Sequence, residues 1–360
     1  MSLDWTQFVT AGGGVADQAL PAIRFDHLRR MTSSVGLWEH ARYSIPRVEH
    51  GYCTDDNARA LMLISRQQDM SPELTDLARI YMAFLQDAVS LHGGFRNRRL
   101  ADGSWADDRG SDDSQGRAIW ALGSVIRFGS EAWMREAAFE LFERQRFNSA
   151  SPRANAIAVL GTADVLAVEP TNARARRAVE EWAAHLRVGD DGRWPWPESR
   201  LAYANARIPE GLLAAGEALD SDQVMKQGFG LLDWLISVET RGAHFSFTPE
   251  GGWALGEPRP GFDQQPVEAA AMADACSRAW SLTGEPRWRE AVMRAAGWLI
   301  GANDHGAVLY DAETGGCYDG LTPRGQSESR SRVDTGRSEH PPASRPGVVR
   351  IDPTWWRRMS

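Results

Sequence analysis

A unit of roughly 50 residues recurs along this chain of 360 residues, and it limits the possible folds more than any other feature. Each unit contains a segment rich in small residues that opens with a polar cluster, and then a more strongly charged segment. The polar clusters begin at Thr54, Ser111, Ser151, Ala204 and Asp263. A period of this length is typical of stacked supersecondary units, so we expect one repetitive domain.

The two kinds of segment differ in the placement of their apolar residues. In the charged segments, such as PELTDLARIYMAFLQDAV, apolar residues recur at i, i+3, i+4 and i+7, as in a helix with one wet face. The small-residue segments are apolar on nearly all sides, as expected of buried helices. The chain is therefore predicted to be all-α, an (α/α)6 toroid with six outer helices, the first over residues 25–40. Inner helices are expected to begin near Asp56, Asp113, Arg153, Asn205 and Gln265.

Composition and charge exclude several classes of function. The net charge of −8 and the pI of about 5.6 disfavour a nucleic-acid partner, because nucleic-acid phosphates attract basic proteins. Long apolar runs and a secretory signal pattern are absent from the sequence, so we expect a cytoplasmic protein without a membrane partner. The three cysteines lack metal-ligand spacing, and no P-loop, G-x-G-x-x-G or H-E-x-x-H motif occurs, which predicts no cofactor and no metal.

Polar side chains cluster where the inner helices are expected to begin. The long links before these helices all lead to one end of the ring, so the clusters should meet at one mouth. A polar residue in a first turn is often only an N-cap, and this structural interpretation is favoured for Asp55 and Asp112. Carboxylates further inside these largely apolar helices are costly to bury, and they are therefore more informative. The candidate site residues are Asp55, Asp56, Asp112, Asp113, Asn205, Arg207, Glu210, Asp263, Gln264, Gln265 and Glu268.

Tryptophans in polar links and an arginine behind the acids extend this candidate site. Trp194, Trp196 and Trp253 stand in links that contain Gly or Pro, where an indole either covers the core or stacks on the C–H face of a sugar. Arg117 follows Asp113 by one helical turn, and it either clamps the acids of the site or forms an ordinary structural ion pair.

Paired carboxylates beside aromatic loops favour hydrolysis of glycosidic bonds. One acid protonates the leaving oxygen, while the other carboxylate attacks the sugar or activates water. We predict Glu210 as the proton donor and Asp113 or Asp56 as the base; the stereochemistry stays open. The eight histidines lie mainly in links and outer helices, which disfavours a sugar epimerase that would use inner-helix histidines as proton carriers.

Five motifs together resemble a bacterial, glycosyltransferase-associated family of the six-hairpin glycosidase-like superfamily: HGYCTDDNARAL, GSDDSQGRAIWALG, YANARIPEGLL, FDQQPVEAAA and GGCYDGL. The resemblance covers about residues 25–324. It implies the (α/α)6 fold, a carbohydrate ligand and, in the last motif, Asp319 as a further binding residue. It also implies a glycosyltransferase partner, because members occur fused to or beside such enzymes. It does not settle the reaction.

The end of the chain departs from the family pattern. Members close with a G-V-N…G-A-E-S-T-L-A segment, which would form the sixth inner helix, whereas residues 325–360 are rich in Ser, Arg and Pro. Removing one base from a back-translation of residues 325–336 gives V-N-R-R-A-G-A-E-S-T-L-A, so we hypothesise a frameshift, with a genuinely divergent tail as the alternative. We expect an extension over 1–24, a toroid over 25–324 without its sixth inner helix, and an irregular tail over 325–360. Such a protein should be marginally stable and weakly active or inactive.

Two functions from different classes stay open. The leading prediction is a glycoside hydrolase-like enzyme acting on oligo- or polysaccharide. The alternative is a non-catalytic glycan-binding partner or accessory domain of a glycosyltransferase, because binding also uses tryptophans and carboxylates. A polyprenyl cyclase on the same toroid would need an aromatic, apolar cavity, and the mouth rich in Arg and Asp argues against it.

Overall fold

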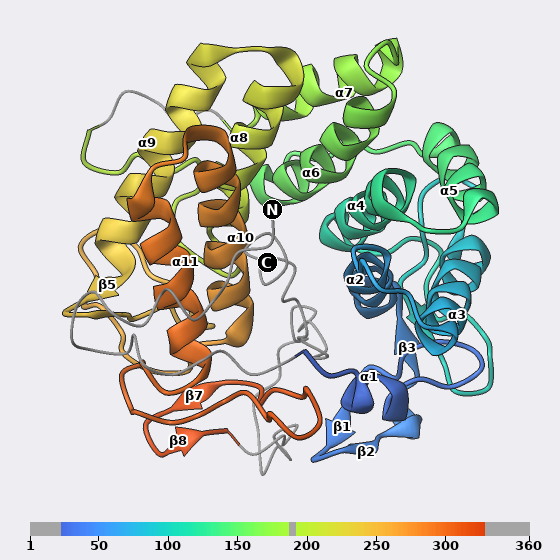
Figure 1. Ribbon diagram of the computed structural model, residues 1–360, viewed down its shortest axis with the longest axis horizontal. Coiled ribbons are helices and arrows are strands. Elements are labelled where there is room, and N and C mark those ends of the chain that lie inside the picture. The colour runs from blue at the N-terminus through green and yellow to red at the C-terminus, as the bar shows by residue number, and fades with distance from the viewer. Residues whose placement is uncertain (1–22, 187–191, 328–360) are drawn as a thin grey trace.

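The computed structural model describes residues 23–186 and 192–327, and this part of the chain is mostly helical (Figure 1). Long helices of two kinds alternate along it. The inner helices are α2 (Thr54–Ser65), α4 (Asp112–Phe128), α6 (Pro152–Val168), α8 (Arg207–Leu219) and α10 (Pro266–Thr283). The outer helices are α3 (Pro72–Ala88), α5 (Ala132–Arg144), α7 (Ala173–Ala184), α9 (Asp222–Glu239) and α11 (Pro286–Leu299).

The helical hairpins follow one another around an arc, with the inner helices toward its centre (Figure 1). Each inner helix packs against the next one, and also against the outer helix that follows it in the chain. This arrangement is the predicted toroid, and every inner helix begins within two residues of its predicted position. The described residues contain five complete hairpins. The hypothesis of a frameshifted tail concerns residues that lie almost entirely outside the described ones.

The prediction of a first outer helix over residues 25–40 is wrong after residue 30. Of residues 25–40, only α1 (Asp26–Arg30) is an α-helix. The Ser33 hydroxyl accepts hydrogen bonds from the backbone N–H groups of Val35 and Gly36, and the chain turns back at this point. A serine that binds nearby backbone groups gives the chain an alternative to the helix, which the apolar period did not indicate.

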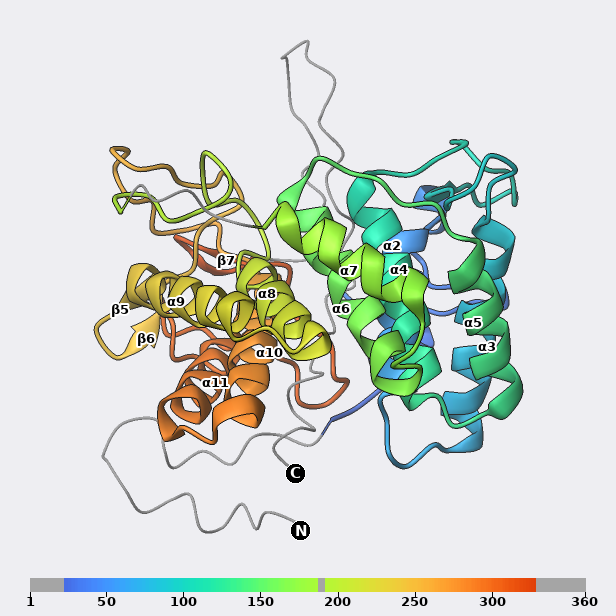
Figure 2. The ribbon, with the colours of Figure 1, turned by 90° about the horizontal axis from the view of Figure 1, so that it is seen from above.

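Strands in the described residues are short antiparallel pairs within the links. Figure 2 shows the long links that precede α4, α8 and α10 at the same end of the molecule, as expected. The pair β3 and β4 joins the link before α2 to the link before α4. The four pairs are β1 (Ala41–Arg42) with β2 (Ile45–Pro46), β3 (Tyr52–Cys53) with β4 (Arg98–Arg99), β5 (Thr240–Arg241) with β6 (His244–Phe245), and β7 (Leu321–Thr322) with β8 (Gly325–Gln326).

Burial explains the small-residue composition of the inner helices. Every residue of α2 is buried, and α6 is buried from residue 153 to residue 166. Helices α4 and α6 approach closely at two glycines, because a Cβ atom on Gly123 would lie 2.0 Å from the carbonyl oxygen of Gly161. The outer helices bury one face only; α7, for example, buries Ala175, Val179 and Trp182. No described helix is both long and apolar enough to cross a bilayer.

Candidate functional site

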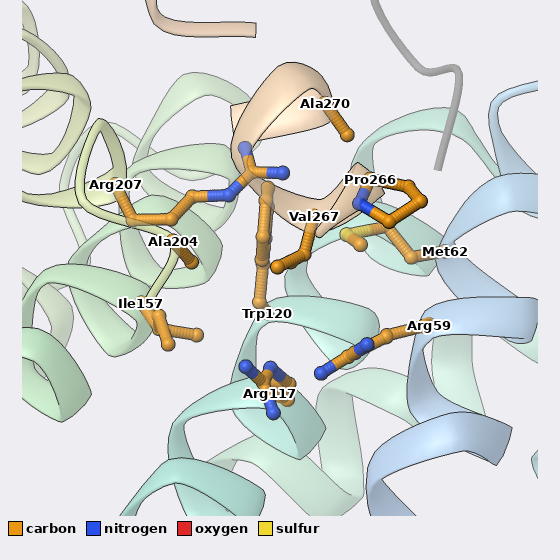
Figure 3. Close-up of a pocket in the computed structure, with 10 residues that line it drawn as sticks. All are labelled: Arg59, Met62, Arg117, Trp120, Ile157, Ala204, Arg207, Pro266, Val267 and Ala270. Carbon is orange, nitrogen blue, oxygen red and sulfur yellow. The ribbon is translucent and has the colours of Figure 1, made fainter. Parts of the chain in front are cut away.

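The inner helices enclose a small central pocket (Figure 3). All five inner helices contribute to it, together with the turn that leads into α8. The pocket has a volume of about 30 Å³, room for one or two water molecules or for one small chemical group. Its lining residues are Arg59, Met62, Arg117, Trp120, Ile157, Ala204, Arg207, Pro266, Val267 and Ala270.

Asp55 joins two arginines of the central pocket. Its carboxylate accepts hydrogen bonds from Nη2 of Arg59 at 3.0 Å and from Nη1 of Arg117 at 2.6 and 2.5 Å. All three side chains are less than a tenth exposed. Arg117 pairs with Asp55 on the neighbouring inner helix, and this contact fits both interpretations of Arg117, as a clamp on the acids and as a structural ion pair.

The helix caps are not the acids that sequence reasoning favoured. Cys53 caps α2 and Ser111 caps α4, because each side chain accepts a hydrogen bond from a backbone N–H group in the first turn of its helix. Asp112 accepts a hydrogen bond of 2.6 Å from the hydroxyl of Ser149. The interpretation of Asp55 and Asp112 as caps is therefore wrong, and both are placed by longer-range contacts.

Asp56, one of the two predicted bases, is fully buried. Its Oδ2 accepts a hydrogen bond of 3.0 Å from the thiol of Cys53, and its Oδ1 has no hydrogen-bond partner among the described residues. Burial raises the pKa of Asp56 well above its usual range, although the charge of Arg59 opposes the rise. Asp56 does not line the central pocket, and its burial disfavours the charged carboxylate.

Asp113 is only partly buried at the start of α4, unlike Asp55 and Asp56. In the part of the chain that the structure describes, its carboxylate forms no hydrogen bond or ion pair. Burial raises the pKa of Asp113, the charges of Arg117 and Arg153 oppose the rise, and the charge of Asp55 adds to it. A partly accessible acid that holds its proton more tightly than usual has the properties of a proton carrier.

Glu210, the predicted proton donor, lies in a buried network of ion pairs. It is 3% exposed, it accepts a hydrogen bond of 2.7 Å from Arg207, and it lies 3.8 Å from Nε of Arg278. Arg207 also donates to Asp274 at 2.7 Å. Glu210 does not line the central pocket. These partners indicate a structural role, and nothing in the surroundings of Glu210 supports its predicted role as proton donor.

Glu268 holds the turn that leads into α8. Its carboxylate accepts hydrogen bonds from the backbone N–H groups of Ala204 and Asn205, the second of them at 3.1 Å. The side-chain amide of Asn205 also donates to it at 3.4 Å. Ala204 lines the central pocket with a positive φ of 47°. Burial raises the pKa of Glu268 to about 8. The predicted binding residues Asn205 and Glu268 therefore shape one wall of the pocket.

The predicted rim tryptophans pack against one another. Trp196 is 4% exposed and stacks on Trp234 of α9, with the ring centroids 5.7 Å apart. Trp194 forms T-shaped contacts with Trp234 and with Trp253, at centroid distances of 5.4 Å and 5.6 Å. The indole N–H of Trp194 donates to the carbonyl of Glu198. None of the three predicted tryptophans lines the central pocket, and the buried Trp196 covers the core.

The remaining predicted residues lie beside the start of α10. Gln264 is fully buried and accepts a hydrogen bond of 3.0 Å from the indole N–H of Trp298. Gln265 precedes α10 without a side-chain cap bond, and Asp263 has a positive φ of 70°. Asp319 is partly buried in the link before β7. These four predicted residues do not line the central pocket.

Sequence reasoning missed the apolar lining of the central pocket. Met62, Trp120 and Ile157 come from the middle of inner helices, where the sequence pattern indicates ordinary core residues. The one available signal was Trp120, a large ring in a helix rich in small residues; the guanidinium of Arg207 lies 4.6 Å from its centre. In the described residues, no group of three or more His, Cys, Asp or Glu side chains is arranged to hold a metal ion.

Comparison with known proteins identifies the fold. No model of a known family matches the chain, and no curated protein does. A sugar epimerase from a ruminal bacterium is 14% identical with a TM-score of 0.66, over 90% of this chain and 92% of that one. The cellobiose 2-epimerase of Spirochaeta thermophila is 15% identical with a TM-score of 0.62, over 81% and 83%. An α-mannanase of Bacteroides thetaiotaomicron is 9% identical with a TM-score of 0.51, over 78% and 79%. The chain thus has the (α/α)6 toroid fold, which it shares with these solved structures.

Proposed function

We propose that the protein is a carbohydrate-active enzyme of the glycoside hydrolase type, with Asp113 as the group that gives a proton to the glycosidic oxygen. The observation that carries this proposal is the state of Asp113, which is partly accessible, unpaired in the described part of the chain, and raised in pKa by burial. Similar solved structures include sugar epimerases and an α-mannanase, which supports a carbohydrate as the ligand.

The proposed step needs a second carboxylate beside the proton donor. Asp113 transfers its proton to the leaving oxygen as the glycosidic C–O bond breaks, and water or a carboxylate then bonds to the anomeric carbon. Asp55 is the better candidate for the second group, because its charge acts on Asp113 and it adjoins the central pocket. Asp56 is fully buried beside Cys53. The proposal moves the role of donor from Glu210 to Asp113.

Carboxylate chemistry is favoured over histidine chemistry by the inner helices themselves. The five inner helices contain no histidine, and no histidine lines the central pocket. A proton carrier at this site must therefore come from another residue type. We assign the role to Asp113, which does not itself line the pocket but lies one helical turn before the lining residue Arg117 in α4.

Binding without cleavage is the second candidate function. It is favoured by the ion pairs that engage Asp55 and Glu210, since a carboxylate that is held by arginines is a weaker base. A glycosyltransferase partner, which the family resemblance implies, would belong to this second function.

The experiment that tests the proposal is product analysis on a panel of oligosaccharides, for the natural chain and for Asp113→Asn. We expect cleavage by the natural chain, and a loss of about 100-fold or more in the variant with binding retained. Asp69→Asn, an exposed acid in the link after α2, is the matched control and should cleave like the natural chain. Glycan binding without any cleavage by the natural chain would instead establish the second function.

A further inference from the structure

All the charged side chains that line the central pocket are positive. Arg59, Arg117 and Arg207 are its charged residues, and they come from three different inner helices. Figure 3 shows the guanidinium groups of Arg59 and Arg117 on one side of Trp120 and that of Arg207 on the other. The rest of the lining is apolar, so charges inside the pocket interact more strongly than they would in water.

The acids that hold these arginines stand outside the lining. The carboxylate of Asp55 accepts hydrogen bonds from Nη2 of Arg59 and from Nη1 of Arg117, so two positive charges share this one carboxylate. The partners of Arg207, Glu210 and Asp274, are less than a tenth exposed. None of the three acids lines the pocket, so a group that enters it meets guanidinium edges and apolar carbon.

The size of the pocket determines what can enter. A volume of about 30 Å³ holds one or two water molecules, which is too little for a sugar ring. A carboxylate is planar and small, and it matches the fork of N–H donors on a guanidinium. The ring that bears it would then remain outside the pocket.

We infer that the substrate is an acidic sugar, a uronic acid or a similar carboxylated residue, whose carboxylate enters the central pocket among Arg59, Arg117 and Arg207. This inference rests on the proposed function, because it names the substrate class of the same site. The arginines orient the sugar through its carboxylate, and Arg117 follows Asp113 by one helical turn in α4, so the sugar is held beside the proposed proton donor.

The test is calorimetric binding of oligouronates and of the same oligosaccharides after chemical reduction of each carboxylate to an alcohol. Length and linkage are then identical, and only the carboxylate group is changed. We expect the reduced forms to bind at least about tenfold more weakly, as expected for loss of a charge-assisted pair. Sugar phosphates form a separate arm of the experiment, and tighter binding of these than of the uronates would overturn the carboxylate assignment.

Two variants assign the effect to the pocket. Arg59→Gln should remove most of the preference for the charged form, and Arg59→Lys should keep part of it, which separates loss of charge from misfolding. Arg79→Gln, on an exposed face of α3, is the control and should keep the full preference. Equal binding of charged and reduced sugars would overturn the inference and leave the proposed function standing. Failure to bind or cleave any glycan, charged or neutral, would overturn both.

Discussion

Glu210 and Arg207 form a buried ion pair of 2.7 Å within one turn of α8. Arg207 lines the pocket, while Arg278, on the other side of Glu210, lines a separate cavity with Arg127 and Glu217. The pair therefore belongs to an ion-pair network that connects the lining of the central pocket with the lining of this second cavity.

Glu210→Gln should destabilise the protein strongly and leave catalysis by the folded fraction nearly intact. Removing one partner of a buried pair leaves uncompensated charge, here on Arg207 and Arg278, at a cost of about 3–5 kcal/mol. Urea unfolding measures this loss. The kcat of the folded variant measures the second part, and a fall in kcat as large as that of Asp113→Asn would restore Glu210 as the proton donor.

Gly123→Ala should destabilise the crossing of α4 and α6. Its Cβ would meet the backbone of Gly161 at 2.0 Å, so the helices must separate, at a cost of about 1–3 kcal/mol or more. Gly230→Ala is the matched control, because Gly230 is an exposed glycine of α9 with nothing within 4 Å of the added methyl group. It should be neutral or stabilise by up to about 1 kcal/mol. Similar midpoints for both variants in urea would contradict this packing.

Helix type and order were predictable because they follow from local composition. A helix with neighbours on every side can carry few charges and needs small residues, as at Gly123 and Gly161, so the inner helices are recognisable one at a time. The first outer helix was not predictable in this way. Its end depends on side-chain bonds of Ser33 to the backbone, which compete with the helical period.

The site was predictable only as a set of residues at one end of the ring. Sequence places Asp55, Asp56 and Asp113 in first turns, but the contact that each makes depends on neighbouring helices. Arg117 of α4 reaches Asp55 of α2, and this leaves Asp113 unpaired in the described chain. The tryptophans were ambiguous for the same reason, because the edge contacts of Trp194 come from partners far away in sequence.

Ala204→Gly should stabilise the protein. Ala204 has a φ of 47°, where an L side chain costs roughly 1–2 kcal/mol and glycine does not. The greater freedom of glycine in the unfolded chain offsets part of this gain, so a net increase of about 0.5–1 kcal/mol is expected. Ala206→Gly in the same turn is the control, because Ala206 is buried and has a φ of −65°, so its replacement should destabilise. A lower thermal midpoint for Ala204→Gly would show that the loss of its methyl group from the pocket wall outweighs the relief of strain.

Glu268 should make stability fall as pH rises from about 4.5 to about 8. Burial raises its pKa from 4.5 to about 8, so the folded state holds the proton more tightly than the unfolded state. This favours folding fully below the unfolded pKa, and the advantage is lost progressively until the pH passes the folded pKa. In Glu268→Gln the decline should be smaller by on the order of a few kcal/mol across this window. Urea midpoints at pH 4.5, 6.5 and 8.5 measure it, with Glu250→Gln on an exposed turn as the control. If the midpoints of Glu268→Gln follow the same pH slope as those of the control, the three N–H donors from Ala204 and Asn205 hold the carboxylate ionised, and Glu268 does not contribute to the pH dependence.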